Sequence, residues 1–356
     1  MSYDRRVPDD RAEALRAILD QAYSPSDHPA LIWQTEQWHV ERPLDGARIA
    51  DATPVFHNTL AKYVPLLAGG ADLTVVLSPL LPHDPDTVTL LHEVGVPVTT
   101  RSPAGCDVAL DCAGILAETP ARLGYVELTK SGQHVYESST APVFLADDSR
   151  IKLIETVLGT GDGFVRGLAH FGHPDLNGRA IVVFGCGKVG RGAALAALAA
   201  GASVTLVDPD PDVRPPAVCS LIDAADTSAV RAALDRAWGV ASATGIAGAL
   251  GPWAEYLAGS DLVVANLGAE DEFGPDMPEH RVLNDKAPVN FALDEPTHLR
   301  YIDATMALHN AGAVELRSGA YHPGINRPPR AVEDDILGIV RRRGTIELSA
   351  IEEDML

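Results

Sequence analysis

The feature that most constrains the fold of this chain is a glycine-rich turn between a β-rich run and a helix. The run Ala180-Ile-Val-Val-Phe184 predicts a buried strand, and the turn Gly185-Cys-Gly-Lys-Val-Gly190 follows it directly. An alanine-rich helical pattern then continues from Arg191 to Ala200. A strand, a turn with this glycine spacing and a helix are together typical of a dinucleotide-binding α/β unit. The sequence therefore predicts a Rossmann-type domain in the second half of the chain.

Each glycine of this turn has a physical role in holding a dinucleotide. Gly185 permits the tight turn, Gly187 lets a pyrophosphate approach the backbone, and Gly190 allows close packing of the helix on the strand. Lys188 and Val189 lie at the helix N-terminus, where backbone N–H groups and the positive end of the helix dipole attract phosphates. The alternative interpretation is a glycine turn in a sheet that binds no cofactor.

An acidic residue in the next predicted strand indicates which cofactor would fit. The run Ser203-Val-Thr-Leu-Val207 ends at Asp208, 18 positions after Gly190. A carboxylate at this place accepts hydrogen bonds from ribose hydroxyls and repels a 2′-phosphate. We therefore predict that the cofactor is NAD and not NADP.

The length of 356 residues exceeds what one compact core usually carries, so we expect two domains of α/β class. Residues 1–150 alternate helical and β-rich patterns and predict a substrate domain, in which Asp111 ends a strand. Residues 151–320 would form the NAD-binding domain, with a hinge helix at about 151–172, and residues 321–356 a helix and tail returning to the first domain. The predicted helices are 11–23, 57–67, 88–94 and 333–342, and further predicted strands are 73–77, 96–100, 108–111, 239–243, 261–265 and 300–306.

Composition and charge exclude several classes of function. The formal net charge of −21, from 28 Lys and Arg against 49 Asp and Glu, disfavours binding to nucleic acid or to an anionic membrane. The first residues carry no apolar run typical of a secretory signal, and the most apolar stretch is too short to cross a membrane. The four cysteines form no C-x-x-C pair, and His170-Phe-Gly-His173 lacks further ligands at a suitable spacing. We expect a cytoplasmic protein without a metal site.

Several motifs occur in an order that is more specific than the glycine turn alone. They lie between about Asp51 and Pro323, and comprise Thr129-Lys-Ser-Gly132, Ala141-Pro-Val-Phe-Leu-Ala-Asp-Asp-Ser-Arg-Ile-Lys152, Gly185–Gly192, Val207-Asp-Pro-Asp-Pro211, Ser242-Ala-Thr-Gly245, Asn266-Leu-Gly268, Asn310-Ala-Gly312 and His322-Pro323. In this order the segments resemble those of the S-adenosylhomocysteine hydrolase family.

The resemblance implies an architecture and a type of chemistry. In that family a substrate domain and an NAD domain close on each other across a cleft, usually within an oligomer. Tightly held NAD oxidises the ribose 3′-hydroxyl, the thiol leaves by elimination, water adds, and the ketone is reduced again. For this chain it implies a small-molecule substrate and a homo-oligomer, either a dimer or a tetramer.

The resemblance also implies roles for individual residues. Lys152 would assist deprotonation of the hydroxyl, Asp111 would be the base at C4′, and His57 would lie near the leaving group and water. Glu155 takes the place of the aspartate one helical turn after the lysine. Residues implied to contact the cofactor are Thr129, Ser131, Thr244, Gly245, Asn266 and Asn310, and those implied to contact the substrate are Thr59, Glu127 and His322.

Two of these roles also make sense without the family. A lysine beside a positively charged nicotinamide ring can have a lowered pKa, which lets it act as a base near neutral pH. A carboxylate at the carboxyl end of a parallel strand lies where ligands bind in α/β sheets.

Departures from the family pattern limit how far the function can be transferred. Leu128 stands where the family has a ribose-binding glutamate, with Glu127 adjacent to it, and Ala269 replaces a histidine. The chain stops at Leu356, without the extension that reaches a neighbouring subunit's cofactor, so we expect looser cofactor binding. Losing buried polar partners disfavours the parent substrate. A changed substrate, a net NAD-dependent dehydrogenase on another alcohol, and a non-catalytic NAD-binding regulator therefore stay open.

Overall fold

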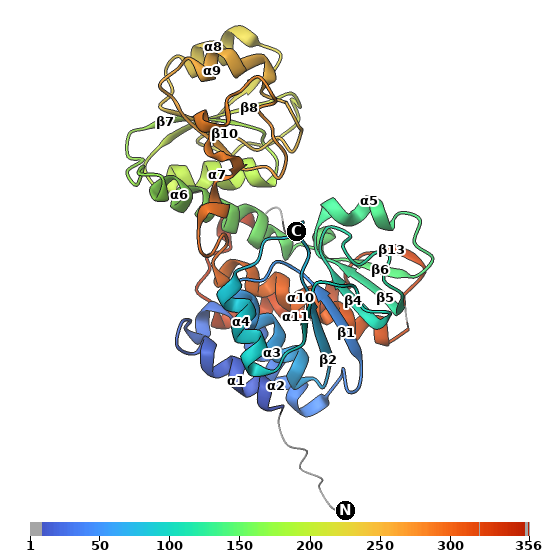
Figure 1. Cartoon of the computed structure of the whole chain (residues 1–356). Helices are drawn as coiled ribbons and strands as arrows, with labels where there is room; N and C mark the ends of the chain where they lie inside the picture. Colours follow the sequence, from blue (N-terminus) through green and yellow to red (C-terminus); the bar gives the residue numbers. More distant parts are fainter. Residues whose placement is uncertain (1–8, 320, 353–354, 356) are drawn as a thin grey trace, which may run out of the picture. The chain divides into compact units, whose positions relative to one another are not determined.

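A computed structural model describes residues 9–319, 321–352 and 355. The chain forms two compact units (Figure 1). Unit 1 comprises Met1–Ile154 and Leu299–Leu356, and unit 2 comprises Glu155–His298. Each unit contains a parallel β-sheet with helices, which confirms the predicted α/β class.

Within the described residues, unit 2 has a six-stranded parallel sheet in the order β12-β11-β10-β7-β8-β9. The sheet order reverses between β7 and β10, as it does between the first and fourth strands of a Rossmann fold. The strands are β7 (Ala180–Phe184), β8 (Ser203–Asp208), β9 (Ser220–Asp223), β10 (Gly239–Ser242), β11 (Val263–Asn266) and β12 (Leu283–Pro288), and the helices are α6 (Thr160–His170), α7 (Lys188–Ala199), α8 (Thr227–Leu234) and α9 (Ala254–Ala258).

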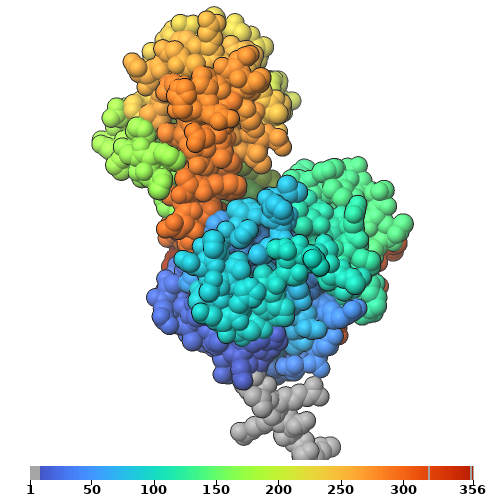
Figure 2. Space-filling model, viewed as in Figure 1, coloured from blue at the N-terminus to red at the C-terminus, as the bar shows by residue number. Residues whose placement is uncertain are grey.

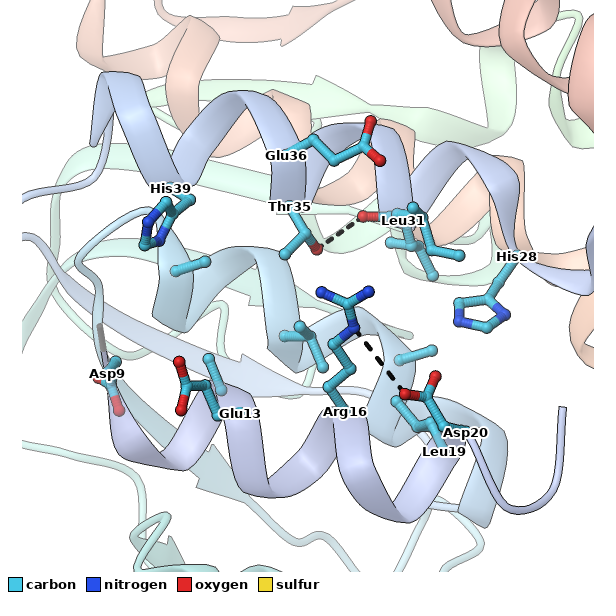
Figure 3. Close-up of a pocket in the computed structure, with 15 residues that line it drawn as sticks. Asp9, Glu13, Arg16, Leu19, Asp20, His28, Leu31, Thr35, Glu36 and His39 are labelled. Atoms are coloured by element: carbon cyan, nitrogen blue, oxygen red, sulfur yellow. Dashed lines mark hydrogen bonds and ion pairs between the residues drawn. The ribbon is translucent and has the colours of Figure 1, made fainter. Parts of the chain in front are cut away.

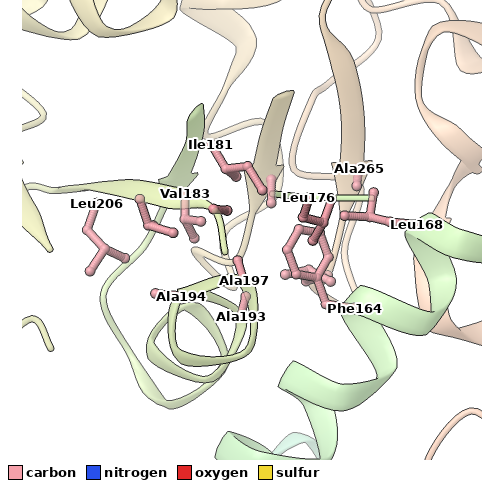
Figure 4. Packing of buried hydrophobic residues seen from close by; sticks show 14 of the residues in the cluster. Phe164, Leu168, Leu176, Ile181, Val183, Ala193, Ala194, Ala197, Leu206 and Ala265 are labelled. Atoms are coloured by element: carbon pink, nitrogen blue, oxygen red, sulfur yellow. The ribbon is translucent and has the colours of Figure 1, made fainter. Parts of the chain in front are cut away.

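Small side chains on α7 let this helix pack closely on the sheet of unit 2. Ala193, Ala194 and Ala197 are buried against Val183 and Leu206 of the central strands (Figure 4). The helix α7 also contacts α6 closely, at Gly192 of α7 and Gly161 of α6. A β-carbon on Gly161 would collide with the carbonyl oxygen of Gly192. Close packing holds the N-terminus of α7 firmly at the carboxyl end of β7.

Unit 1 contains, among its described residues, a seven-stranded parallel sheet in the order β13-β6-β5-β4-β1-β2-β3. Its first six strands in chain order follow the same plan as unit 2, with the reversal between β1 and β4. The strands are β1 (Arg48–Ala52), β2 (Asp72–Val76), β3 (Val98–Thr99), β4 (Cys106–Asp111), β5 (Ala121–Glu127), β6 (Pro142–Leu145) and β13 (Gly324–Asn326).

The helices of unit 1 come from both ends of the chain. They are α1 (Asp10–Leu19), α2 (Pro29–Glu41), α3 (Leu60–Ala68), α4 (Pro85–Val94), α5 (Gln133–Tyr136), α10 (Leu299–Arg317) and α11 (Arg330–Arg343). The visible face of unit 1 in Figure 2 consists of segments from the first half of the chain, coloured blue to green, and α10 is largely covered there. The helix α10 packs on α2, α3, β4 and β5.

The helix α10 differs from what the sequence predicted for this part of the chain. The segment Arg300–Met306, predicted to be a strand, belongs to this helix. The structure also divides the chain after Ile154 and after His298, where the sequence predicted 150 and 320. The second boundary falls at the start of α10 because this helix is buried within unit 1, where its Asp303 carboxylate accepts hydrogen bonds from the first backbone N–H groups of α2, at 2.9 and 3.0 Å.

The predicted hinge helix contains an irregular segment. A π-helical stretch, Ile154–Gly159, precedes α6, and the boundary between the two units falls at its start. Such single-turn π segments interrupt α-helices frequently at functional sites. Among the helices of the described residues, none is both long enough and apolar enough to cross a membrane.

Candidate functional site

The glycine turn of unit 2 has the geometry that a phosphate-binding loop needs. Gly185 has φ +97°, a backbone conformation that side chains with a β-carbon rarely adopt. A β-carbon on Gly190 would collide with the carbonyl oxygen of Gly185. A β-carbon on Gly187 would meet nothing within 4 Å, so there is open space beside the N-terminus of α7. This cradle fits the pyrophosphate of a dinucleotide, which α7 would attract through its N–H groups.

Asp208 is fixed beside the same turn. Its carboxylate accepts hydrogen bonds from the backbone N–H of Cys186, at 2.6 Å, and of Asp210, at 2.9 Å. A carboxylate offers about four lone-pair sites, so these two bonds leave acceptors for ribose hydroxyls. Lys188 is exposed at the start of α7, and Val189 packs partly against the core.

A second part of the cofactor site is the segment that follows β10. The strand β10 pairs with β7 so that Ser242 lies opposite Phe184. The N–H groups of Thr244 and Gly245 donate to the buried carboxylate of Glu272, at 2.7 and 2.8 Å. Asn266, at the end of β11, is fully buried and donates to three backbone carbonyls of its own surroundings. The predicted cofactor residues of unit 2 thus gather at one edge of its sheet.

In unit 1, acidic side chains lie at the carboxyl ends of the strands where the sheet order reverses. Asp51 lies near the end of β1 and Asp111 at the end of β4, whose register places Asp111 opposite Ala52 and Glu127. Ligands of open α/β sheets bind outside the carboxyl ends of strands at this reversal point. We therefore regard this edge as the candidate substrate site.

Asp111 is completely buried and has an unusual pKa. Its carboxyl group accepts hydrogen bonds from the N–H of Cys112, at 2.9 Å, and of Leu116, at 3.0 Å, and from the hydroxyl of Tyr136. Burial raises the pKa of Asp111 to about 7, the negative charge of Glu127 adds to the rise, and the hydrogen bonds oppose it. A carboxyl group with this pKa exchanges its proton near neutral pH, as a general acid or base requires.

Lys152 lies in the same electrostatic neighbourhood and is also buried. Burial raises the pKa of the Cys112 thiol to about 12, and the charge of Lys152 opposes that rise. Burial also lowers the pKa of His309, and the charges of Lys62 and Lys152 lower it further. The charges of Lys152 and Asp111 thus both act on the thiol of Cys112, the residue that directly follows β4.

Glu127 is buried as well, but its carboxylate is used by the chain itself. It accepts hydrogen bonds from the N–H of Ala113, at 3.0 Å, of Gly114, at 3.1 Å, and from both the N–H and the hydroxyl of Thr129, each at 2.8 Å. The Thr129 hydroxyl also lies 2.8 Å from that of Ser131. This network ties the turn after β4 to the end of β5, which favours a structural role for Glu127.

The other residues predicted for the site have partners of their own or lie at other places in the fold. The Nδ1 atom of His57 is 3.2 Å from the Tyr23 hydroxyl, and the Thr59 hydroxyl donates to the carbonyl of Pro54 at 2.9 Å. Asn310 is buried in α10 and donates to the carbonyl of Lys62 at 2.9 Å. Glu155 is half-buried in the π-helical stretch of unit 2, and His322 is exposed in unit 1.

Sequence reasoning missed a buried ion pair near this edge of unit 1. The Nζ atom of Lys62 contacts the carboxylate of Asp51, and both side chains are at most 1% exposed. Asp51 also accepts a hydrogen bond from the Thr53 hydroxyl, at 2.6 Å. A lysine within the apolar run Leu60–Ala68 was the available signal, because a lysine there needs a buried partner.

A separate pocket of unit 1, with a cavity volume of about 410 Å³, lies between α1, α2 and α3 (Figure 3). Leu19 and Leu31 line it together with polar side chains such as Arg16 and Thr35. The described residues that line it include none of those predicted for the site. In the part of the chain that the structure describes, no three His, Cys, Asp or Glu side chains are grouped so as to bind a metal.

Fold and site together define a protein with two α/β units, of which the second has a dinucleotide-binding loop. Residues 174–271 match a family described as putative NAD(P)-binding, which confirms the predicted type of cofactor. The chain is 25% identical over 224 residues to an adenosylhomocysteinase of Thermosynechococcus vestitus, covering 53% of this chain and 52% of that protein. It is 27% identical over 237 residues to an S-inosyl-L-homocysteine hydrolase of Methanopyrus kandleri, covering 55% and 56%.

These similarities confirm the resemblance inferred from the motifs, and the matches span about half the length of the curated relatives. Among solved structures, a dipicolinate synthase component from Bacillus halodurans is similar with a TM-score of 0.49 and 15% identity, over 74% of this chain and 96% of that one. A D-lactate dehydrogenase of Lactobacillus jensenii with NAD+ has a TM-score of 0.37 and 14% identity, over 79% and 100%. Both structural similarities are weak.

Proposed function

We propose that this protein is an NAD-dependent enzyme that oxidises a hydroxyl of a nucleoside-like or polyhydroxylated small molecule. Where the substrate carries a leaving group, elimination, hydration and re-reduction would follow, as in the S-adenosylhomocysteine hydrolase family. The observation that carries the proposal is Asp111, a carboxyl group with a pKa raised to about 7 at the sheet reversal of unit 1. Binding of a dinucleotide by unit 2 does not require such a group, whereas proton transfer to and from a substrate does.

Each part of the proposed site has a defined task. The turn around Gly187 would hold the pyrophosphate and Asp208 the adenosine ribose; when bound, NAD supplies the electron acceptor for oxidation of the hydroxyl. Lys152, which is buried in unit 1, would take the proton of that hydroxyl. Asp111, with its neighbour Tyr136 as hydrogen-bond donor, would take the proton from the adjacent carbon.

The substrate is proposed to differ from that of the parent family. Leu128 is buried and apolar where the resemblance implies a ribose-binding glutamate, and Ala269 replaces a histidine. The first test is incubation of the full chain with NAD and either S-adenosylhomocysteine or S-inosylhomocysteine, with analysis of nucleosides and free thiol by mass spectrometry. Free homocysteine would show that hydrolase chemistry is retained. Intact substrates would direct a screen towards other alcohols, in which NADH release would identify a net dehydrogenase.

A substitution of Lys152 separates an enzyme from a non-catalytic NAD-binding regulator. Lys152→Met should abolish turnover of the identified substrate and leave the affinity for NAD unchanged, measured by calorimetry. An unchanged rate in this variant would contradict the proposed role of Lys152. The proposal also includes a homo-oligomer of two or four copies in the cytoplasm, and light scattering on the purified protein tests the number of copies.

A further inference from the structure

We propose that Glu272 positions the nicotinamide-side wall of the cofactor site; this inference rests on the proposed binding of NAD by unit 2. Glu272 is completely buried, and it lies outside the motifs that predicted the site. It touches neither the glycine turn nor Asp208 through any hydrogen bond found among the described residues. Its effect would therefore be confined to one half of the cofactor.

The carboxylate of Glu272 gathers the donors of the segment that follows β10. It accepts hydrogen bonds from the N–H of Thr244 at 2.7 Å, the hydroxyl of Thr244 at 2.7 Å, and the N–H of Gly245 at 2.8 Å. The hydroxyl of Ser242 donates to it as well. A buried acceptor bound by four donors fixes the backbone of residues 242–245 before any cofactor arrives.

The segment Asn266-Leu-Gly268 brings Glu272 to this place. The amide of Asn266 donates to the carbonyls of Gly268 at 3.1 Å, Glu270 at 2.8 Å and Lys286 at 2.7 Å, and so holds the loop after β11 in shape. A β-carbon on Gly268 would collide with a carboxylate oxygen of Glu272. Asn266, which the resemblance assigned to the cofactor, and Gly268 thus build the frame behind the cofactor wall.

The topology of unit 2 tells which end of the cofactor this wall would face. A Rossmann fold consists of two mononucleotide-binding halves that meet where the strand order reverses. The half made by β7, β8 and β9 carries the glycine turn and Asp208, which serve the pyrophosphate and the adenosine ribose. Residues 242–245 belong to the half made by β10, β11 and β12. Glu272 therefore acts on the nicotinamide half.

The test compares two ligands on two variants of the full chain. Glu272→Gln keeps the size of the side chain but turns an N–H₂ group towards backbone donors, which leaves buried donors unpaired. We expect roughly tenfold weaker NAD binding by calorimetry. ADP-ribose, which lacks the nicotinamide, should bind with unchanged affinity. Glu255→Gln, an exposed change in α9 of the same unit, is the matched control and should bind both ligands as the wild type does.

Each outcome decides between the two claims. If the wild type binds ADP-ribose and NAD and Glu272→Gln binds both as tightly, the role of Glu272 is refuted while the cofactor site stands. If Glu272→Gln loses both ligands equally, Glu272 only supports the fold, and the positioning role is also refuted. If the wild type binds no NAD, the proposed function fails first.

A measurement on the wild type keeps the inference testable even if Glu272→Gln does not fold. Hydrogen exchange in the absence of cofactor should show slow exchange of the Thr244 and Gly245 amides, because both donate to a buried carboxylate. Exchange of these amides as fast as that of the exposed residue Ala247 would refute the proposal.

Discussion

Two alanine substitutions in one glycine turn should have different effects. Gly190→Ala should lower the stability of the fold, whereas Gly187→Ala should weaken cofactor binding and leave the stability unchanged. In Gly190→Ala the new β-carbon meets the carbonyl group of Gly185, a backbone group that cannot rotate away. In Gly187→Ala the new β-carbon meets no atom within 4 Å, and the φ of −73° suits alanine. The same chemical change therefore probes the folded chain at one position and the ligand space at the other.

The magnitudes follow from these contacts. Adding a methyl group to a closely packed position such as Gly190 lowers the free energy of unfolding by about 1–3 kcal/mol. For a unit of this size, that lowers the midpoint of thermal unfolding by roughly 2–12 °C. At Gly187, the gain from a less flexible unfolded chain and the small loss of a glycine N-cap nearly cancel, within about 0.5 kcal/mol. The added methyl group would occupy the space of the pyrophosphate and weaken NAD binding on the order of 10–100-fold.

The assay is thermal unfolding without cofactor, followed by calorimetric titration with NAD, on the wild type and both variants. The expected pattern is a lower midpoint for Gly190→Ala, and an unchanged midpoint with weak NAD binding for Gly187→Ala. Gly187→Ala that binds NAD as tightly as the wild type would refute the placement of the pyrophosphate. Equal losses of stability in both variants would refute the steric argument itself.

Three further predictions concern charged groups. Asp111 has its pKa raised from 3.8 to about 7, so its proton stabilises the folded state at low pH and this contribution is lost as the pH rises from about 4 through about 7. Relative to Asp111→Asn, the wild type should therefore be more stable in urea at about pH 5 than at about pH 8, and a difference independent of pH would contradict the raised pKa. Lys62→Met should lower the free energy of unfolding by about 3–5 kcal/mol, because it leaves the Asp51 carboxylate buried without its cation. Chemical denaturation measures this loss. A loss below about 1 kcal/mol would show that the pair is not ionised. Asp208→Asn should reduce the ratio of the affinity for NAD to that for NADP, measured by calorimetry. The substitution removes the charge that repels a 2′-phosphate and keeps an oxygen that accepts from the Cys186 amide. An unchanged ratio would place the adenosine ribose elsewhere.

The parts of the structure that the sequence predicted well are those set by local geometry. The strand Ala180–Phe184 and the glycine turn after it occur as predicted, because the turn conformation and the helix contact depend on residues within a few positions. The prediction of a strand at Arg300–Met306 was wrong, because most residues of α10 are buried against the rest of unit 1. A helix buried in this way loses the alternation of apolar and polar faces that makes it recognisable.

The candidate site was predictable in part for the same reason. The resemblance led to Asp111 and Lys152, which are both buried in unit 1, and their roles as site residues stay predictions. Asp51 and Glu272 were not predicted, because no local sequence pattern indicates their partners. Asp51 contacts Lys62, and Glu272 lies in a loop that the fold brings to Thr244. This chain has 49 Asp and Glu residues, so a single carboxylate does not indicate a functional site until the groups that donate to it are known.

The contact between Asp51 and Lys62 restricts the routes by which this chain could have changed over time. Losing either partner alone leaves a buried ionisable group without its partner, at a cost of about 3–5 kcal/mol out of a typical total stability of about 5–15 kcal/mol. Replacing both with apolar residues of similar volume can be neutral. We therefore expect single-step substitution at either position to be strongly selected against and the double replacement to be tolerated. Across related sequences the two residues should be present together or absent together, and a lineage that lost the pair had to cross an unstable intermediate or change both codons at once.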